Sequence, residues 1–575
     1  MKKKVVNIPA TLIVVGSLLS QCHSGKSFDQ DAIASDSLTI AKGEQSFTKN
    51  CSGCHNFRQD GIGPQLTGIT EELPGDQIAG FIRNSQQVIA SGNERAKQLF
   101  ARYKKAVMPS FSAMTDDEVG AIISFLHTKK RGTARKRQPN KNELTNPIPE
   151  PIQLSSLVVA LKEVTQIPAS DAKPPLARIT KLTYQPKTGS LFVNDLRGII
   201  YKLKEGKPLV YFDIGKMRPA FIKEPGLATG LGSFSFHPGF LSNGLLYTTH
   251  TEAAGTRRAD FAFDDSIKVQ LQWVLTEWKT NTPTSDSFSG TGRELMRIDM
   301  VSGIHGVQEI TFNPNSKAGD KDYGKLYIGV GDGGSVENGY EQLVRSKHRI
   351  WGAILRIDPM GRNSLNRQYG IPADNPFAKD PDEKTFREIY AYGFRNPHRI
   401  TWTKTGDMLV SNIGQANIES LNLIKPGHDY GWPIREGTFI SSDVNENLGS
   451  VYPLPPNDTT YHITYPVAQF DHDEGLAISG GFEYSGNAIP ELKGKFLFGD
   501  IPSGRLFYIE SGDIMPGKEA VIKEWKISTG GSVKSLRELC QCERVDLHFG
   551  RDMNGELYIL TKADGKIYKL VKPAL

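Results

Sequence analysis

A glycine followed by a short apolar run recurs six times in the C-terminal part of the chain, and this repeat restricts the fold more than any other feature. The runs begin at Gly189, Gly244, Gly324, Gly406, Gly494 and Gly555. A repeated unit of short strands with few helical patterns predicts a β-propeller with one blade per repeat. We therefore expect an all-β six-bladed propeller over residues 153–575, with loop insertions where the repeats are unevenly spaced. The alternative is an unrelated pair of β-sandwiches.

The segment Cys51-Ser52-Gly53-Cys54-His55 precedes the repeats and has the spacing of a c-type haem attachment site. The thiols of Cys51 and Cys54 would bond to the haem vinyl groups, and His55 would be an axial ligand of the iron. A carbonyl of the following Gly61-Ile62-Gly63-Pro64 loop would hold the other ring nitrogen of this histidine. A redox pair or a zinc knuckle is the alternative, but no second Cys/His pair lies nearby to complete a tetrahedral zinc site.

Two helical patterns enclose this motif. The first runs through residues 40–48 and carries Gly43 and Phe47 on one face. The second begins at the sequence Thr115-Asp-Asp-Glu118, which is a capping box. Its apolar face is formed by Val119, Ile122, Ile123 and Leu126. These patterns predict a small helical domain around the haem motif.

Residues 37–128 resemble a class I cytochrome c, a small all-α fold, in the order of the first helix, C-x-x-C-H, Met108-Pro109 and the last helix. The resemblance implies that the last helix, with Phe125, crosses the first. It also implies that the Met108 thioether is the sixth iron ligand, which would raise the reduction potential. Met114 is the rival ligand, but the family places an apolar residue at that point, just before the last helix.

The N-terminus resembles the leader of a bacterial lipoprotein. Lys2-Lys3-Lys4 is a basic segment, and the apolar run over residues 8–19 is short for a membrane span. We expect residues 1–22 to act as a signal peptide and Cys22 to be lipidated; the alternative is an uncleaved anchor. Either would place the protein in the cell envelope, with the periplasmic side favoured. The net charge of +6 over 575 residues does not indicate nucleic-acid binding.

Residues 129–152 are basic and contain several prolines, and we expect them to link the two domains. The linker is either a solvated spacer or a contact to an anionic lipid surface. Of the five cysteines, Cys540 and Cys542 remain once lipid and haem have taken the others. In an oxidising compartment this C-x-C pair could form a disulfide, which we favour, and the alternative is two free thiols.

Within the predicted propeller, the chain is similar to the glucose/sorbosone dehydrogenase family. The similar stretches are Gly230-Leu-Gly-Ser-Phe-Ser-Phe-His-Pro-Gly-Phe, Leu326-Tyr-Ile-Gly-Val-Gly-Asp-Gly-Gly, Trp351-Gly-Ala-Ile-Leu-Arg-Ile-Asp-Pro, Ala391-Tyr-Gly-Phe-Arg-Asn-Pro-His-Arg, Gly427-His-Asp-Tyr-Gly-Trp-Pro and Ser479-Gly-Gly-Phe-Glu-Tyr. These proteins are six-bladed propellers that use pyrroloquinoline quinone (PQQ), so the resemblance implies a PQQ-dependent sugar dehydrogenase.

The resemblance assigns roles to seven residues. His305 is implied as the general base, Asp332 as an acidic residue that binds the sugar, and Arg395 as a contact to the quinone that steadies its reduced form. Further contacts to PQQ or to a calcium ion bridged to it are implied for Asn396 (PQQ), Arg544 (PQQ), Gly414 (calcium) and Gln415 (calcium), the last two through backbone carbonyls.

Three positions depart from the pattern of the soluble glucose dehydrogenases. Pro502 stands where they have a lysine that contacts PQQ, and Ala228 where they have a glutamine that contacts the sugar. Ile304 replaces the acidic residue beside the catalytic histidine. These changes argue against glucose as the substrate.

Together these features predict a quinohaemoprotein that oxidises an aldose or a related sugar at PQQ. It would pass electrons to haem c and then to a downstream acceptor, while a lipid anchor holds it to a membrane. A two-electron site needs a one-electron outlet, which explains the fusion of the two domains. The alternatives are a propeller that binds a partner without catalysis, or a docking scaffold for an electron-carrying cytochrome.

Overall fold

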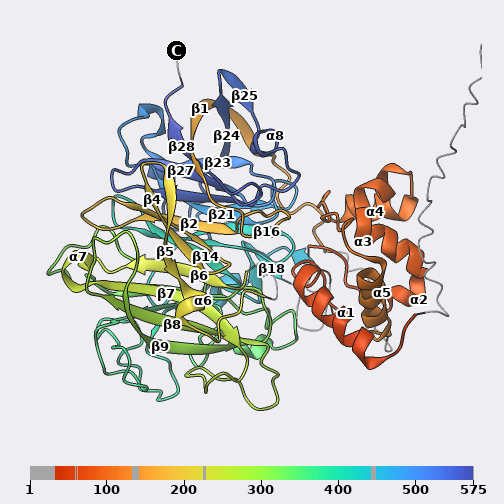
Figure 1. Ribbon diagram of the computed structural model, residues 1–575, viewed down its shortest axis with the longest axis horizontal. Coiled ribbons are helices and arrows are strands. Elements are labelled where there is room, and N and C mark those ends of the chain that lie inside the picture. Colours follow the sequence, from red (N-terminus) through yellow and green to blue (C-terminus); the bar gives the residue numbers. More distant parts are fainter. Residues whose placement is uncertain are drawn as a thin grey trace, which may run out of the picture.

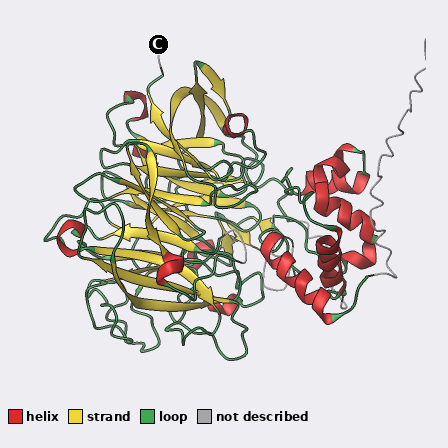
Figure 2. Ribbon diagram, in the orientation of Figure 1, coloured by secondary structure: helices red, strands yellow, loops and turns green. Residues whose placement is uncertain are grey.

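The computed structural model describes residues 33–58, 60, 62–131, 142–224, 228–441 and 449–573. Helices gather in the N-terminal part and strands in the part that follows (Figure 2). The predicted leader with Cys22, Gly61 and the middle of the linker lie outside the described residues. None of the helices in these described ranges is long and apolar enough to span a membrane.

The N-terminal domain is helical, as predicted. Its helices are α1 (Ser37–Asn50), α2 (Ile69–Glu72), α3 (Gly75–Ala90), α4 (Glu94–Arg102) and α5 (Asp116–His127). The Thr115/Glu118 capping box begins α5. A Cβ atom on Gly43 would lie 1.9 Å from the carbonyl oxygen of Ala121, so the lack of a side chain lets α1 and α5 pack closely. The rings of Phe47 and Phe125 are 5.4 Å apart at this crossing.

The C-terminal domain is the predicted six-bladed propeller. From the inner to the outer strand, blade one is β2 (Ile179–Tyr184), β3 (Leu191–Asp195), β4 (Ile199–Lys204) and β5 (Lys207–Asp213). Blade two is β6 (Leu231–Phe236), β7 (Leu245–Ala253), β8 (Leu271–Thr280) and β9 (Gly290–Met300). Blade three is β10 (Glu309–Phe312), β11 (Leu326–Val330), β12 (Ala353–Ile357) and β13 (Ile389–Tyr392).

The other three blades follow the same plan. Blade four is β14 (Pro397–Trp402), β15 (Met408–Asn412), β16 (Ile418–Leu423) and β20 (Ala468–Asp471). Blade five is β21 (Ile478–Glu483), β22 (Lys495–Asp500), β23 (Leu506–Glu510) and β24 (Lys523–Thr529). Blade six is β26 (Leu547–Arg551), β27 (Leu557–Thr561), β28 (Lys566–Val571) and β1 (Gln153–Gln166).

Short elements decorate the blades. They are strands β17 (Arg435–Glu436), β18 (Phe439–Ser441), β19 (Val451–Tyr452) and β25 (Ser532–Lys534), α-helices α6 (Ile214–Met217), α7 (Phe240–Asn243) and α8 (Leu536–Cys540), and 3₁₀-helices η2 (Glu341–Leu343), η3 (Asp458–Tyr461), η4 (Pro490–Leu492) and η5 (Ser511–Asp513). The β17–β19 sheet is an insertion between the last two strands of blade four.

The six repeated glycines mark the second strand of every blade. Each lies one or two residues before β3, β7, β11, β15, β22 or β27, and all six have a φ between 64° and 95°. Side chains disfavour this left-handed region, so glycine allows the tight turn out of the inner strand. At Gly244 space is also limiting, because a Cβ atom would lie 2.1 Å from the carbonyl oxygen of Thr280.

The first strand of the domain closes the ring. β1 pairs with β28 in antiparallel fashion and supplies the outer strand of blade six. It also pairs in parallel with β24 of blade five. The N-terminal and C-terminal ends of the propeller sequence are therefore held in one blade.

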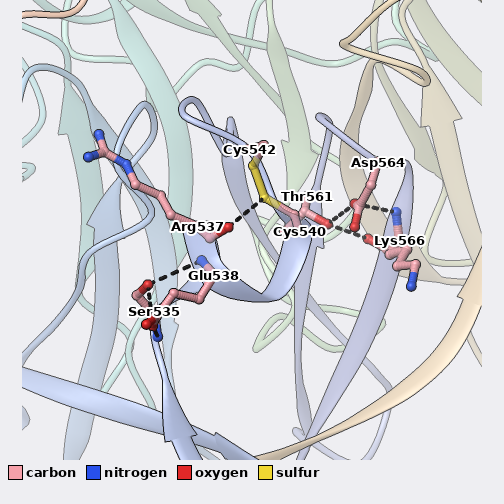
Figure 3. The surroundings of a disulfide bond; sticks show 8 residues. All are labelled: Ser535, Arg537, Glu538, Cys540, Cys542, Thr561, Asp564 and Lys566. Carbon is pink, nitrogen blue, oxygen red and sulfur yellow. Dashed lines mark hydrogen bonds between the residues drawn. A yellow bond between two sulfur atoms is a disulfide. The ribbon is translucent and has the colours of Figure 1, made fainter.

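The predicted disulfide between Cys540 and Cys542 is present at the end of α8 (Figure 3). A second capping box, formed by Ser535 and Glu538, begins this helix. Cys51 and Cys54 are free thiols.

The helical domain docks on one end of the propeller. Because four antiparallel strands return the chain to the end where it started, every inner strand begins at the same end, which we call the mouth. Arg58 donates a hydrogen bond to the Asn338 carbonyl (3.0 Å) and Lys104 pairs with Asp473 (2.6 Å). Both propeller partners lie in connections at the mouth, and Figure 1 shows the helices beside β16 and β18.

The C-terminal part of the linker is laid along the propeller and is not a free spacer in the described residues. The backbone N–H groups of Ile148 and Ile152 donate to the carboxylates of Asp471 (3.1 Å) and Glu474 (3.2 Å). Leu144 forms a β-bridge with Val451. These contacts tie the chain down between the two domains.

Candidate active site and haem crevice

The helical domain contains a crevice of about 250 Å³ that is lined by Cys51, Cys54, His55 and Met108. The Pro64 carbonyl accepts a hydrogen bond from Nδ1 of His55 (2.8 Å), as the sequence predicted for this loop. This bond leaves Nε2 as the ring nitrogen that can ligate a metal. Burial lowers the pKa of His55 and so favours the neutral form that a ligand needs.

The residues of this crevice fit a covalently bound haem. Two unpaired thiols, one available imidazole nitrogen and one thioether line the same mainly apolar space. Burial raises the pKa of Cys51 to about 12, so its thiol is protonated before attachment. Met114 instead packs against the helix core, which agrees with the choice of Met108 as the sixth ligand.

At the mouth of the propeller, His305 and Asp332 form a hydrogen-bonded pair. Nδ1 of His305 lies 2.8 Å from Oδ1 of Asp332, and Asp332 is completely buried. The second carboxylate oxygen accepts a hydrogen bond from Nε1 of Trp432 (3.0 Å). Nε2 of His305 forms no hydrogen bond with a described residue and is available to a substrate.

Two local features position this pair. Asp332 directly follows β11, whose register is fixed by β10 and β12. His305 precedes β10 and has a φ of 48°, a conformation that residues with side chains seldom adopt. Burial favours the neutral acid, but the charge and hydrogen bond of His305 and the charge of Arg395 prevail and lower the pKa of Asp332. Asp332 therefore stays ionised beside the imidazole.

The sequence assigned Asp332 to sugar binding and noted that Ile304 replaces the acid beside the histidine. The structure places the Asp332 carboxylate against His305 instead, with both of its oxygens engaged by protein groups. Asp332 thus provides the acidic partner of the histidine that Ile304 cannot provide. The two residues are 27 positions apart in the sequence and meet only in the folded blade, so the sequence did not reveal their pairing.

Arg395 is buried, and each of its three guanidinium nitrogens donates at least one hydrogen bond to the protein. Nε donates to the Gln415 side chain (2.6 Å), one terminal nitrogen to the Gly414 carbonyl (2.5 Å) and the other to Glu337 (2.8 Å). The resemblance implied a contact of this guanidinium to the quinone, and that contact stays a prediction. In the structure its charge is balanced by Glu337, and Arg395 holds the mouth loops together.

The Gly414 carbonyl, one of the two predicted calcium ligands, is already engaged by the protein. One carboxylate oxygen of Glu436 accepts four backbone N–H groups from residues 415–418, at 2.8 to 3.0 Å. The Gly414 carbonyl already accepts a hydrogen bond from a cationic group, that of Arg395. Among the described residues no group of three or more His, Cys, Asp or Glu side chains could hold a metal ion.

The remaining predicted residues lie around the mouth. Asn396 is buried next to Arg395, and its backbone N–H donates to the Asn412 side chain (3.0 Å). The Pro502 carbonyl accepts from the backbone N–H of Val545 (2.9 Å) in the connection into β26. Arg544 lies in that same connection, but it lines the haem crevice.

Sequence reasoning missed a cationic group at the mouth. Lys562 follows β27 and forms no ion pair with a described carboxylate. Burial, together with the nearby Arg399 and Arg544, lowers its pKa to about 8. His398 and His548 lie close by with ring centroids 5.6 Å apart, and none of their ring nitrogens has a partner among the described residues. The absence of a lysine at position 502 was the one signal in the sequence that could have pointed to a cation elsewhere at the mouth.

These groups fit an acidic organic cofactor, because Lys562 offers a half-buried ammonium and the histidines offer buried ring nitrogens. Buried ring nitrogens without partners are costly unless a hydrogen-bonding group meets them. The buried Gln415 Nε2 also lacks a partner among the described residues. Lys562, Asn396 and the two histidines are therefore the residues that could bind such a cofactor. Arg395 and the Gly414 carbonyl are already bonded to each other and to other protein groups.

The structure thus has two parts, a six-bladed propeller and a helical domain on its mouth whose crevice fits a haem. This is the class of a propeller fused to a cytochrome c. Family comparisons agree with this division. The family described as Glucose / Sorbosone dehydrogenase matches residues 181–569, and that described as Cytochrome c matches residues 40–130. The chain belongs to the glucose/sorbosone dehydrogenase family and carries a cytochrome c domain.

Relatives of known name differ in what their names say they do. The HIPL1 protein of Arabidopsis thaliana is 24% identical over 400 residues, which cover 60% of this chain and 53% of the relative. Human Hedgehog-interacting protein is 25% identical, covering 63% and 46%. Quinoprotein glucose dehydrogenase B of Acinetobacter calcoaceticus is 26% identical, covering 55% and 64%. The chain spans about half the length of the first two.

Solved structures support the fold. The soluble aldose sugar dehydrogenase of Escherichia coli in its apo-form is 16% identical, with a TM-score of 0.50. It aligns over 72% of this chain and 100% of its own. At this identity the likeness concerns the propeller fold alone.

Proposed function

We propose that this chain is a cytochrome-linked oxidoreductase that oxidises an aldose or a related sugar at the propeller mouth and passes the electrons to haem c. The observation that carries the proposal is that the His305–Asp332 pair belongs to the same end of the propeller on which the haem crevice docks. A base and an electron outlet are two of the parts that a sugar dehydrogenase needs, beside an acceptor for the hydride.

The proposed reaction removes a hydride from the anomeric carbon and a proton from its hydroxyl group, and a lactone forms. Nε2 of His305 accepts the hydroxyl proton, since Asp332 keeps the other ring proton on Nδ1. The imidazolium that forms lies beside a buried carboxylate and is stabilised by it. Trp432 fixes that carboxylate through its second oxygen.

Bound PQQ would supply the two-electron acceptor for the hydride. Lys562 and Asn396 would hold its acidic groups, while Arg395, already paired with Glu337, keeps the surrounding loops in place. The calcium ion suggested by family resemblance has no part in this proposal. A haem held by Cys51, Cys54, His55 and Met108 would carry the two electrons one at a time to a downstream one-electron acceptor.

We also propose that Cys22 carries a lipid that anchors the protein in the cell envelope, with both domains on the periplasmic side. The support is the basic and apolar leader of residues 1–22. Incorporation of labelled fatty acid into the wild-type protein, but not into Cys22→Ala, tests it. Equal labelling of the two proteins contradicts a lipid at this position.

The test of the enzymatic proposal is haem reduction by sugar. The haem-loaded protein is incubated with PQQ and a panel of aldoses without oxygen, and the visible haem spectrum is followed. Reduction that needs both PQQ and one class of sugar supports the proposal. If dithionite reduces the haem but no sugar does, and PQQ does not bind, the proposal fails.

The second candidate is a recognition propeller that carries an electron-transfer domain. The relative named Hedgehog-interacting protein and the saturated guanidinium of Arg395 favour it. Stoichiometric binding of PQQ separates the two functions, because a recognition propeller needs none.

A further inference from the structure

Arg544 is the propeller's contribution to the haem crevice. It lies in the connection between α8 and β26, at the mouth of blade six. All other residues that line the crevice belong to the helical domain, from Phe47 to Leu126. Thus, among the described residues, one side chain of the propeller joins those of the cytochrome domain in lining the crevice.

The guanidinium is held in place from the propeller side. Its Nε donates to Oδ1 of Asp546 (2.7 Å), while 38% of the Arg544 side chain remains exposed. Asp546 is buried and follows Arg544 by two residues, so the contact is local and rigid. The terminal nitrogens form no hydrogen bond with a described residue, which leaves them available to the crevice.

The crevice and the propeller mouth meet at this side chain. Arg544 lines the crevice together with Cys54, His55 and Met108. From the propeller side it is bonded to Asp546, which lies in the same mouth connection. The propeller therefore contributes a cationic group to the wall of the haem crevice.

We propose, on the basis of the function proposed above, that Arg544 is a positioning residue for electron transfer between the two domains. Its guanidinium lies in the wall of the crevice and would stabilise the negative charge that a bound haem gains on reduction. Electrons from the mouth would reach the haem past this side chain, the proton of the sugar would stay with His305, and a downstream acceptor would take up the electrons.

Arg544 is therefore assigned to the haem and not to the quinone. The resemblance to the glucose/sorbosone dehydrogenases had suggested a contact to PQQ, because an arginine at the mouth is a suitable partner for a carboxylate. The crevice that this side chain lines is absent from a propeller without a cytochrome domain. The role follows from the docking of the two domains.

The experiment compares Arg544→Gln with the wild type as full-length, haem-loaded protein supplied with PQQ. The haem midpoint potential is measured by spectroelectrochemistry without sugar. Stopped-flow spectroscopy then gives the rate of sugar-driven haem reduction, and a small dye that takes electrons from the propeller directly reports on sugar oxidation. Arg544→Lys keeps the charge, and the exposed Arg537→Gln removes the same charge seven positions away.

We expect Arg544→Gln to lower the potential and to slow haem reduction by about tenfold or more, the effect of losing one charged contact. Reduction of the dye should stay near the wild-type rate. Arg544→Lys should recover most of the potential, and Arg537→Gln should change neither quantity. An unchanged potential together with an unchanged rate of haem reduction overturns the proposal.

The same measurements distinguish two further outcomes. If Arg544→Gln loses dye reduction in the same proportion as haem reduction, the residue serves the propeller site, and its assignment to the haem is wrong. If the wild type shows no sugar-dependent dye reduction, the enzymatic function fails, whereas the potential still reports on Arg544. A lowered potential in that case supports the place of Arg544 in the crevice, and an unchanged one refutes it.

Discussion

Asp332→Asn is the sharpest test of the proposed base. The substitution keeps the size of a side chain that is completely buried and can still accept a hydrogen bond from Trp432. It removes the negative charge that lies 2.8 Å from Nδ1 of His305. We therefore expect the fold and the haem to be preserved while the imidazolium loses its counter-charge.

The magnitude follows from the buried hydrogen bond. A hydrogen bond to a charged group contributes about 1.5–3 kcal/mol, and about 1.4 kcal/mol corresponds to a tenfold change in rate. Loss of the charge alone should lower turnover by about ten- to a hundredfold. An amide N–H facing Nδ1 would also favour the wrong tautomer, which costs about 10⁴-fold in a comparable histidine–aspartate pair. We expect a fall in kcat of about 10²- to 10⁴-fold with a KM close to wild type.

The assay is dye-linked sugar oxidation by the haem-loaded protein with PQQ, because the dye avoids the electron-transfer step. Asp320→Asn, which alters an exposed carboxylate in the same blade, is the matched control. Trp432→Phe should lose about fivefold, since it removes one neutral partner of Asp332. Wild-type turnover by Asp332→Asn would refute the role of the pair, provided that the haem spectrum is intact.

Three further predictions concern the haem and the stability of the propeller. Gly63→Ala should displace His55 and give a mixed or five-coordinate haem spectrum, because a Cβ atom would lie 2.5 Å from the imidazole ring. Met108→Ala should keep the covalent haem but lower its midpoint potential, as measured by redox titration; an unchanged potential would exclude Met108 as a ligand. Glu252→Gln should cost about 3–5 kcal/mol in the free energy of unfolding, since it breaks a buried pair with Arg297 (2.7 Å). Burial opposes ionisation of Glu252, but its hydrogen bonds to cations lower the pKa, so this stabilisation is present above about pH 4.3 and is lost as the pH falls. Denaturant titrations should show a flatter acid dependence for the variant, and parallel curves would contradict this account.

Local signals in the sequence were sufficient for both folds. Three patterns each indicate a contact within one small domain: the C-x-x-C-H spacing, the Thr115–Glu118 capping box and the Gly43/Phe47 face. The six glycines predicted six blades because every blade needs the same left-handed turn before its second strand. Such features depend on neighbours in the chain, so they can be recognised without knowledge of tertiary structure.

The site was predicted less well because its contacts join distant blades. His305 and Asp332 are 27 residues apart, and Trp432 lies 100 residues beyond Asp332. Arg395 matched a family motif, but only the fold shows that Glu337 and the 414–415 loop occupy its donor groups. A motif identifies the type of a residue, but it does not show which hydrogen-bond partners that residue already has in the fold.

The docking of the domains bears on the choice between an enzyme and a recognition propeller. A propeller that binds a protein partner through its mouth needs that face uncovered. Here Lys49, Arg58 and Lys104 of the helical domain contact three separate mouth connections, and Arg544 reaches back into the haem crevice. These contacts occupy part of the face that such a partner would use, and they bring the haem crevice to the end of the propeller that holds His305. The arrangement thus supports electron transfer across the mouth, and it predicts that separating the domains, for example by Arg58→Glu with Lys104→Glu, slows haem reduction more than dye reduction. Equal loss of both activities would instead show that the docked domain is part of the sugar site.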